Sequence, residues 1–266
     1  MIPLTTLTPW GDSAERFKHI ELEINTRCDL SCFACDRFSD LPQTWMPNMT
    51  YEQVERFVDE SFALDWEWER IRFLGGEPTL HPNFAGLIGL LVKYRQRYPK
   101  VFLQVLTNGR GRSAEFRDWL KELNISLHAE TKTKGEQPPW FNNFRITPVD
   151  RDPNVGELEP CGIFGIRCCG LGLTRNGYFL DGAGAAVARV AGHDIGIMHL
   201  KDVTWDAMMA QAKVLCRICG HWNPMDGTMV SKLVKETGEV TGAFWTEKLA
   251  AYQRERPKMR VYGEMP

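Results

Sequence analysis

Short apolar runs alternate with amphipathic stretches along the first 150 residues, and this alternation restricts the fold more than any other feature. HIELEINT at 19–26 alternates with the period of a strand, whereas apolar residues recur at helical spacing in 50–64. Strands are predicted at 19–26, 70–76, 101–109, 125–131 and 144–150, and helices at 50–64, 81–98 and 113–123. We expect Thr50 and Gln53 to form a capping box and Ser113 to cap the third helix. This order indicates parallel βαβ units, so we predict an α/β fold whose ligands bind at the carboxyl ends of the strands.

The composition narrows the class of protein. A net charge of −2 over 266 residues, with basic residues scattered, gives no signal for nucleic-acid binding. No apolar run reaches the ~20 residues needed to cross a bilayer, because Gly86 and Gly89 interrupt the longest one. The first residues lack the features of a signal peptide, so we expect a cytoplasmic protein. Cytoplasmic thiols stay reduced, and the eight cysteines are therefore interpreted as metal ligands rather than disulfides.

Three cysteines, Cys28, Cys32 and Cys35, follow the first predicted strand with the spacing C-x3-C-x2-C. Three thiolates on one loop can hold three corners of a [4Fe–4S] cluster and leave the fourth iron open to a ligand. A zinc knuckle lacking one ligand, or a set of buried thiols, is the alternative for this pattern taken alone. The turn GGEP at Gly75–Pro78, which follows the next strand, favours the cluster because its paired glycines let the backbone approach a ligand closely.

Together with the turn TNG at 107–109, these motifs resemble the radical S-adenosylmethionine (radical SAM) superfamily over roughly residues 19–150. The resemblance implies a partial (β/α)6 barrel of the TIM type, in which the amino and carboxylate groups of S-adenosylmethionine chelate the open iron. It implies that one electron, from a flavodoxin or a ferredoxin, splits the cofactor into methionine and a 5′-deoxyadenosyl radical. That radical takes a hydrogen atom from the substrate.

The same resemblance assigns cofactor-binding roles at the ends of the second, third and fourth strands. The GGEP backbone is expected to receive the amino group of the cofactor, while Ser126 and His128 lie where the family often contacts its ribose or carboxylate. The cofactor-binding residues predicted in this way are Gly75, Gly76, Glu77, Pro78, Asn108, Ser126 and His128. One position departs from the family pattern: the residue before the third cysteine is commonly aromatic, but here it is Ala34, preceded by Phe33.

A second group of cysteines follows the predicted barrel: Cys161, Cys168, Cys169, Cys216 and Cys219. We predict a β-hairpin over 171–180 with Asn176-Gly177 as its turn, and a helix over 204–215 that leads into a CxxC motif. This order resembles the twitch (short SPASM-like) extension of the superfamily, which binds an auxiliary [4Fe–4S] cluster. The metal ligands that the resemblance implies there are Cys169, Asp181, Cys216 and Cys219, with Asp181 in the region where a cysteine is expected. Cys161, Cys168 or an open iron that meets the substrate are the alternatives to Asp181.

These expectations divide the chain into a lead-in (1–18), a radical SAM barrel (19–150), a twitch-like region (151–230) and a helical tail (231–266). We interpret the chain as an oxidoreductase acting on a small polar substrate, sugar-like or aminocyclitol-like, since short twitch enzymes include a dehydrogenase of an aminocyclitol. In that chemistry the auxiliary cluster accepts the second electron. A maturase of a ribosomal peptide and a radical epimerase with a spare thiol are the competing enzymes, and a non-catalytic zinc-binding protein is the competing class.

Overall fold

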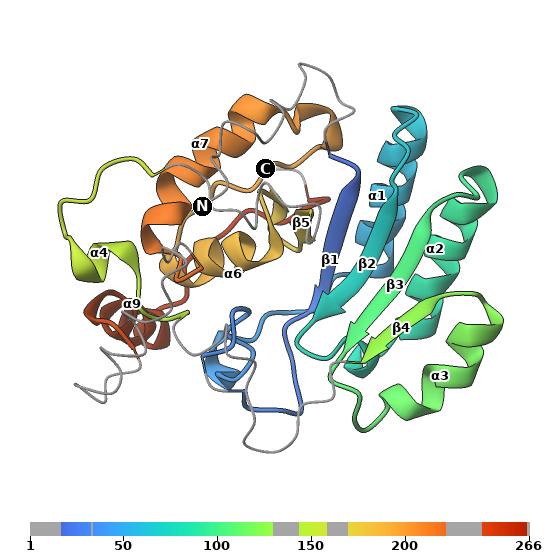
Figure 1. Ribbon diagram of the computed structural model, residues 1–266, viewed down its shortest axis with the longest axis horizontal. Helices are drawn as coiled ribbons and strands as arrows, with labels where there is room; N and C mark the ends of the chain where they lie inside the picture. The colour runs from blue at the N-terminus through green and yellow to red at the C-terminus, as the bar shows by residue number, and fades with distance from the viewer. Residues whose placement is uncertain (1–16, 33, 130–143, 159–169, 222–240, 265–266) are drawn as a thin grey trace, which may run out of the picture.

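One six-stranded sheet organises the chain in a computed structural model that describes residues 17–32, 34–129, 144–158, 170–221 and 241–264. Its strands are β1 (His19–Asn25), β2 (Arg70–Gly75), β3 (Phe102–Thr107), β4 (Ser126–Ala129), β5 (Leu171–Thr174) and β6 (Gly177–Phe179). The order across the sheet is β4-β3-β2-β1-β5-β6, and all neighbours pair in parallel except β5 and β6. The predicted α/β class with a barrel-type order of strands is confirmed (Figure 1).

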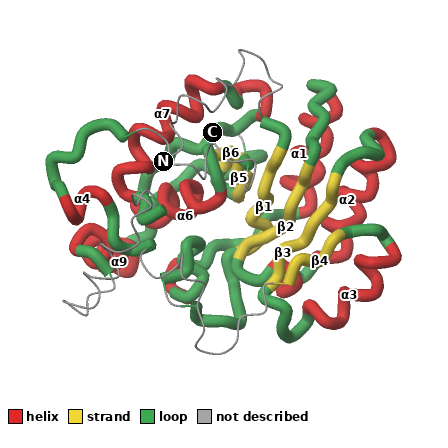
Figure 2. Tube along the Cα trace, in the orientation of Figure 1, coloured by secondary structure: helices red, strands yellow, loops and turns green. Residues whose placement is uncertain are grey.

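Three helices connect the first four strands and lie along one side of the sheet: α1 (Tyr51–Ala63), α2 (Phe84–Arg97) and α3 (Ser113–Glu122) (Figures 1 and 2). The apolar residues of β1, among them Ile20 and Leu22, are fully buried in one core with Val54 and Phe57 of α1. Alternate residues of a strand point to opposite faces, so the remaining residues of β1 lie on the other, inner face.

Helix α1 begins as predicted from the sequence, whereas the beginnings of α2 and α3 differ from the prediction. Thr50 and Gln53 form the predicted capping box at α1, with Gln53 N donating to Thr50 Oγ1 at 3.2 Å and Thr50 N donating to Gln53 Oε1 at 2.9 Å. The predicted cap at Ser113 is wrong, because Arg112 holds the cap position and Ser113 is already helical. The helix expected from residue 81 begins at Phe84, since the residues before it form a 3₁₀ helix and a turn.

The strand predicted at 144–150 is wrong. Its second half is the short helix α4 (Pro148–Arg151). Proline lacks the N–H that a strand ladder needs, and its fixed φ suits the first turn of a helix. Asp150 completes that turn by accepting hydrogen bonds from Thr147 N at 2.8 Å and Thr147 Oγ1 at 2.7 Å.

The second half of the chain packs against the free edge of β1. The predicted hairpin over 171–180 is confirmed as β5 and β6, but its turn is Arg175-Asn176 and not Asn176-Gly177, because Gly177 already pairs with Thr174. Strand β5 extends the sheet by pairing with β1. The helices here are α6 (Gly182–Ala191), which packs on β5, α7 (Trp205–Leu215) and α9 (Ala243–Arg254). Among the described residues, no helix is long and apolar enough to cross a membrane.

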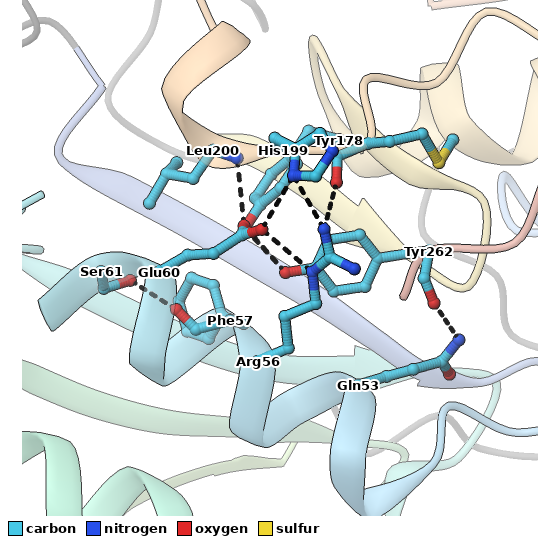
Figure 3. Close-up of polar contacts among 10 residues, drawn as sticks. Gln53, Arg56, Phe57, Glu60, Ser61, Tyr178, His199, Leu200 and Tyr262 are labelled. Carbon is cyan, nitrogen blue, oxygen red and sulfur yellow. Dashed lines mark hydrogen bonds and ion pairs between the residues drawn. The ribbon is translucent and has the colours of Figure 1, made fainter. Parts of the chain in front are cut away.

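Glu60 of α1 ties the first half of the chain to the second (Figure 3). Its Oε2 accepts hydrogen bonds from the hydroxyl of Tyr178 at 3.1 Å, the hydroxyl of Tyr262 at 3.0 Å and the N–H of Leu200 at 3.0 Å. Its Oε1 accepts from Arg56 Nε at 3.0 Å. Burial raises the pKa of both tyrosines, so their hydroxyls remain donors. One carboxylate therefore joins α1 to β6 and to the C-terminal segment.

We expect Glu60→Ala to lower the free energy of unfolding by about 2–4 kcal/mol, because it leaves several buried donors without an acceptor. The control is Asp59→Ala, whose ion pair with Lys93 is exposed and should contribute less than about 1 kcal/mol. Urea denaturation followed by circular dichroism measures both. Equal losses in the two variants would show that Glu60 has no special role in holding the halves together.

Candidate functional site

Three loops meet at the carboxyl ends of β1, β2 and β3, as the sequence predicted. The cysteine loop follows β1, the GGEP turn follows β2, and the TNG turn follows β3. Gly76 N donates to Asn25 O at 3.1 Å and Glu77 N donates to Arg27 O at 2.7 Å. The side chain of Asn25 returns a hydrogen bond to Glu77 O at 2.9 Å. The GGEP turn is thus bonded directly to the start of the cysteine loop.

The two glycines of the turn are required by this contact. A Cβ on Gly75 would lie 2.1 Å from Asn25 O, and a Cβ on Gly76 would lie 2.1 Å from Arg27 O and 2.9 Å from Cys28 N. Real Cβ atoms essentially never approach other atoms so closely, and the atoms that they would meet belong to the backbone. The missing side chains therefore make room for the chain itself, in addition to the ligand approach that the sequence suggested.

We expect Gly76→Ala to displace the cysteine loop and to lower the free energy of unfolding by about 2–4 kcal/mol, because the new Cβ overlaps backbone atoms. The matched control is Gly89→Ala in α2, where a Cβ meets nothing within 4 Å. That change should stabilise the chain by about 0.5–1 kcal/mol, since alanine is the better helix former. Thermal denaturation compares them, and a neutral Gly76→Ala would contradict the close packing of the two loops.

Glu77 is completely buried and fixes the turn from within. Its Oε1 accepts hydrogen bonds from Thr79 N at 3.1 Å and Thr79 Oγ1 at 2.6 Å. Its Oε2 accepts from Asn108 N at 2.8 Å, and Thr107 Oγ1 lies 2.9 Å and 2.8 Å from the two oxygens. The carboxylate of Glu77 thus links the GGEP turn to the TNG turn.

Asn108 of the TNG turn connects these two turns to the cysteine loop. Its Nδ2 donates to Asp29 Oδ1 at 2.6 Å and lies 3.9 Å from Cys28 Sγ, while its Oδ1 accepts from Arg110 N at 2.8 Å. The residue predicted to bind the cofactor is therefore placed against the loop predicted to bind the cluster.

The three thiols of the first cysteine group lie on the loop that follows β1. Cys28, Cys32 and Cys35 are half-buried, and Leu30 N donates to Cys28 Sγ at 3.4 Å. Burial raises the pKa of Cys28 and raises the pKa of Cys35 to about 12, with neighbouring Asp36 adding to the second shift. Such thiols stay protonated until a metal displaces the proton. In the described part of the chain, no three Cys, His, Asp or Glu side chains are grouped so that they could hold a single metal ion. A [4Fe–4S] cluster instead binds its thiolates at separate corners.

Ser126 and His128 share one face of β4, the edge strand. Their partners in the register are Gln104 and Leu106 of β3. Gln104 pairs in turn with Arg72, and Arg72 with Glu21 of β1, so Ser126 and His128 lie on the inner face of the sheet.

Sequence reasoning missed the charges of this inner face. Glu21 accepts hydrogen bonds from Arg72 Nη1 at 2.6 Å and from Arg37 Nη2 at 2.9 Å, and Arg72 Nε donates to Gln104 Oε1 at 2.7 Å. The alternation of HIELEINT could have indicated these charges, because both the apolar and the polar residues of β1 are buried. Glu21, Arg72 and Gln104 thus form a polar row across the inner face of the sheet.

The second cysteine group is described in part. Cys216 and Cys219 are buried just after α7, whereas Cys161, Cys168 and Cys169 lie outside the described residues. Asp181 caps α6 by accepting a hydrogen bond from Gly184 N at 2.5 Å, a role that was not predicted, and burial raises its pKa. Its role as a metal ligand stays a prediction.

One contact brings the two cysteine groups together. His221, two residues after Cys219, places its Nε2 3.2 Å from Oδ2 of Asp36, the residue directly after Cys35. The ring of His221 also packs on Phe144, with ring centroids 4.9 Å apart. The CxxC motif therefore ends beside the first cysteine loop.

Comparison with known proteins agrees with this arrangement. The family model described as the radical SAM superfamily matches residues 22–130. A GTP 3′,8-cyclase of Nautilia profundicola is 30% identical over 156 residues, covering 54% of this chain and 46% of that protein. The GTP 3′,8-cyclase 2 of Pseudomonas aeruginosa is 31% identical over 125 residues, covering 45% and 35%. The chain thus aligns with less than half the length of these relatives.

A solved structure supports the fold over a larger share of the chain. The crystal structure of BtrN in complex with AdoMet and 2-DOIA matches with a TM-score of 0.51 and 20% identity. The match covers 77% of this chain and 88% of BtrN. At this identity the likeness concerns the fold.

Proposed function

Because residues 22–130 of this chain form a radical SAM domain, we propose that Cys28, Cys32 and Cys35 hold a [4Fe–4S] cluster at which S-adenosylmethionine is reductively cleaved. The observation that carries this proposal is the bonded assembly of the cysteine loop with the GGEP and TNG turns. When bound, the cluster supplies the electron that splits the cofactor into methionine and a 5′-deoxyadenosyl radical, which takes a hydrogen atom from the substrate.

The residues of the chain position the cofactor. Glu77 holds the GGEP turn from behind, which presents the backbone of Gly75–Pro78 to the amino group of S-adenosylmethionine. Asn108 holds Asp29 and so keeps the cysteine loop beside that backbone. Ser126 and His128, on the inner face at the edge strand, contact the ribose or the carboxylate of the cofactor.

The substrate is a small polar molecule, sugar-like or aminocyclitol-like, which the enzyme oxidises. Two observations support this class: the buried polar side chains of the inner face, and the likeness of the fold to BtrN, whose structure holds AdoMet and 2-DOIA. The curated relatives named GTP 3′,8-cyclase make a purine nucleotide the competing substrate.

The second half of the chain, residues 151–230, is proposed to bind an auxiliary [4Fe–4S] cluster through Cys169, Cys216, Cys219 and Asp181. Cys161 and Cys168 are alternatives to the aspartate. The contact between His221 and Asp36 supports this assignment, because it keeps the CxxC motif next to the first loop. The cluster would accept the second electron of the oxidation, and a flavodoxin or a ferredoxin would supply the first.

Anaerobic reconstitution with iron and sulfide tests the proposal. We expect about eight irons per chain and 5′-deoxyadenosine from S-adenosylmethionine in the presence of dithionite. A content of about four irons per chain would contradict the auxiliary cluster and support the radical chemistry at the first cluster alone. A colourless protein that retains zinc and forms no 5′-deoxyadenosine would contradict both. Product analysis separates the reactions, since oxidation yields a ketone and epimerisation incorporates hydrogen from solvent.

A further inference from the structure

Glu23 is a buried carboxylate on the inner face of β1, and one of its oxygens accepts no hydrogen bond from the described residues. Its side chain is 4% exposed, and its Oε2 has no hydrogen-bond partner among the described residues. The nearest cation is Arg189, whose Nη2 lies 4.0 Å from Glu23 Oε1. The two terminal nitrogens of Arg189 donate instead to the carbonyl oxygens of Thr44 and Arg37, both at 2.9 Å. Glu23 is therefore flanked by positive charge without being hydrogen-bonded to it.

Glu21 provides the contrast within the same strand. It lies two residues earlier on the same face, and both of its oxygens accept hydrogen bonds from arginines, Arg72 and Arg37. Its charge is thus neutralised inside the protein. The difference between two glutamates on one face indicates that Glu23 has a partner outside the described residues.

The position of Glu23 suits a substrate beneath the cofactor. In the register it pairs with Leu74, the residue just before the GGEP turn, and it lies two residues before Asn25, which bonds to that turn. Two residues of a strand span about 7 Å. Glu23 thus lies on the inner face of the sheet, two residues along β1 from Asn25, where the cysteine loop and the GGEP turn meet.

The Glu23 carboxylate indicates which chemical group of a ligand it could bind. Burial raises the pKa of Glu23, and Arg189 and Arg37 oppose that shift. A buried acceptor without a donor costs about 1–3 kcal/mol, which a ligand recovers only if it donates a hydrogen bond. A hydroxyl or an ammonium group donates; a phosphate brings acceptors and negative charge, which a carboxylate disfavours.

We propose that Glu23 binds an ammonium or hydroxyl group of the substrate and so selects amino alcohols over phosphorylated compounds. This assignment rests on the proposed function, because it names the substrate class of that same site. A preference for amino alcohols distinguishes the chain from an enzyme whose substrate is a nucleoside triphosphate.

Equilibrium dialysis tests the proposal with reconstituted enzyme loaded with S-adenosylmethionine and three labelled probes: an inosamine, inositol and inositol monophosphate. We expect the wild type to bind the inosamine most tightly and the phosphate least. Glu23→Gln should weaken inosamine binding about tenfold to a hundredfold, the effect of losing a charge-assisted hydrogen bond. Glu23→Asp should keep part of the preference, and the control Glu21→Gln should keep the ranking.

Stability gives a second readout that separates binding from folding. Glu23→Gln should leave the thermal midpoint equal or higher, because it removes a buried charge whose Oε2 accepts no hydrogen bond from the described residues. A lower midpoint with unchanged inosamine binding would assign Glu23 to folding and overturn the proposal. Preference for the phosphate, binding of no probe, or the same change of ranking in Glu21→Gln would also overturn it. Formation of 5′-deoxyadenosine by the wild type without any probe reports the proposed function separately.

Discussion

Replacing Cys28 with alanine is expected to remove about four irons per chain and to abolish 5′-deoxyadenosine formation while the chain remains folded. Cys28 is half-buried in a loop, and its thiol receives only weak hydrogen bonds, from Leu30 N and Asn108 Nδ2, so its loss opens no core cavity. Two thiolates and an open iron are too few ligands to retain the cluster that the proposal requires. Iron analysis, absorbance and the thermal midpoint of the metal-free chain measure the three effects.

Ser31→Ala supplies the control for Cys28→Ala, because Ser31 is an exposed residue of the same loop. It should keep the iron content and the cleavage of S-adenosylmethionine. Full iron content and full cleavage activity in Cys28→Ala would place the catalytic cluster elsewhere in the chain.

Replacing Glu77 with glutamine is expected to lower the free energy of unfolding by about 3–5 kcal/mol, the largest stability effect of any single substitution considered for this chain. The donors Thr79 N and Asn108 N point at opposite oxygens of Glu77, and Thr107 Oγ1 lies within reach of both. The amide group of glutamine must turn its own donors toward one of these groups, which leaves buried donors unpaired. Because the same bonds fix the GGEP turn, affinity for S-adenosylmethionine should fall as well.

Glu122→Gln is the matched control for Glu77→Gln, since Glu122 is exposed at the end of α3. It should change the free energy of unfolding by less than about 0.5 kcal/mol. Urea denaturation and calorimetric titration with S-adenosylmethionine compare the two variants. If Glu77→Gln lost stability but bound the cofactor normally, the turn would not need Glu77 for binding.

The meeting of the three loops was predictable from sequence because it depends on local order. Each motif follows a strand, and parallel strands place their carboxyl ends at one edge. The link made by Glu77 was not predictable, because its partner Thr107 lies 30 residues away and the contact depends on the register of β2 and β3. The sequence assigned Glu77 to the cofactor, whereas its side chain bonds only to the protein among the described residues.

Packing between distant segments explains the other differences. The segment 144–150 has apolar residues that suit a strand, but Pro148 and the capping Asp150 turn its end into a helix. The helix α6 was not predicted, since its Gly- and Ala-rich sequence shows little polar contrast; all but its last residue are buried, and it packs on β5. The role proposed for Glu23 was not predictable from sequence, because it depends on the hydrogen-bond partners of both glutamates of β1. No local sequence pattern identifies those partners.

S-adenosylmethionine is expected to bind to the open iron of the cluster on the first cysteine loop. Electron–nuclear double resonance on the reduced, reconstituted enzyme tests it directly, with S-adenosylmethionine that carries an isotopic label on its amino nitrogen. We expect a coupling between that nitrogen and the cluster, which disappears in Cys28→Ala. A cluster signal that is unchanged by saturating labelled cofactor would contradict it.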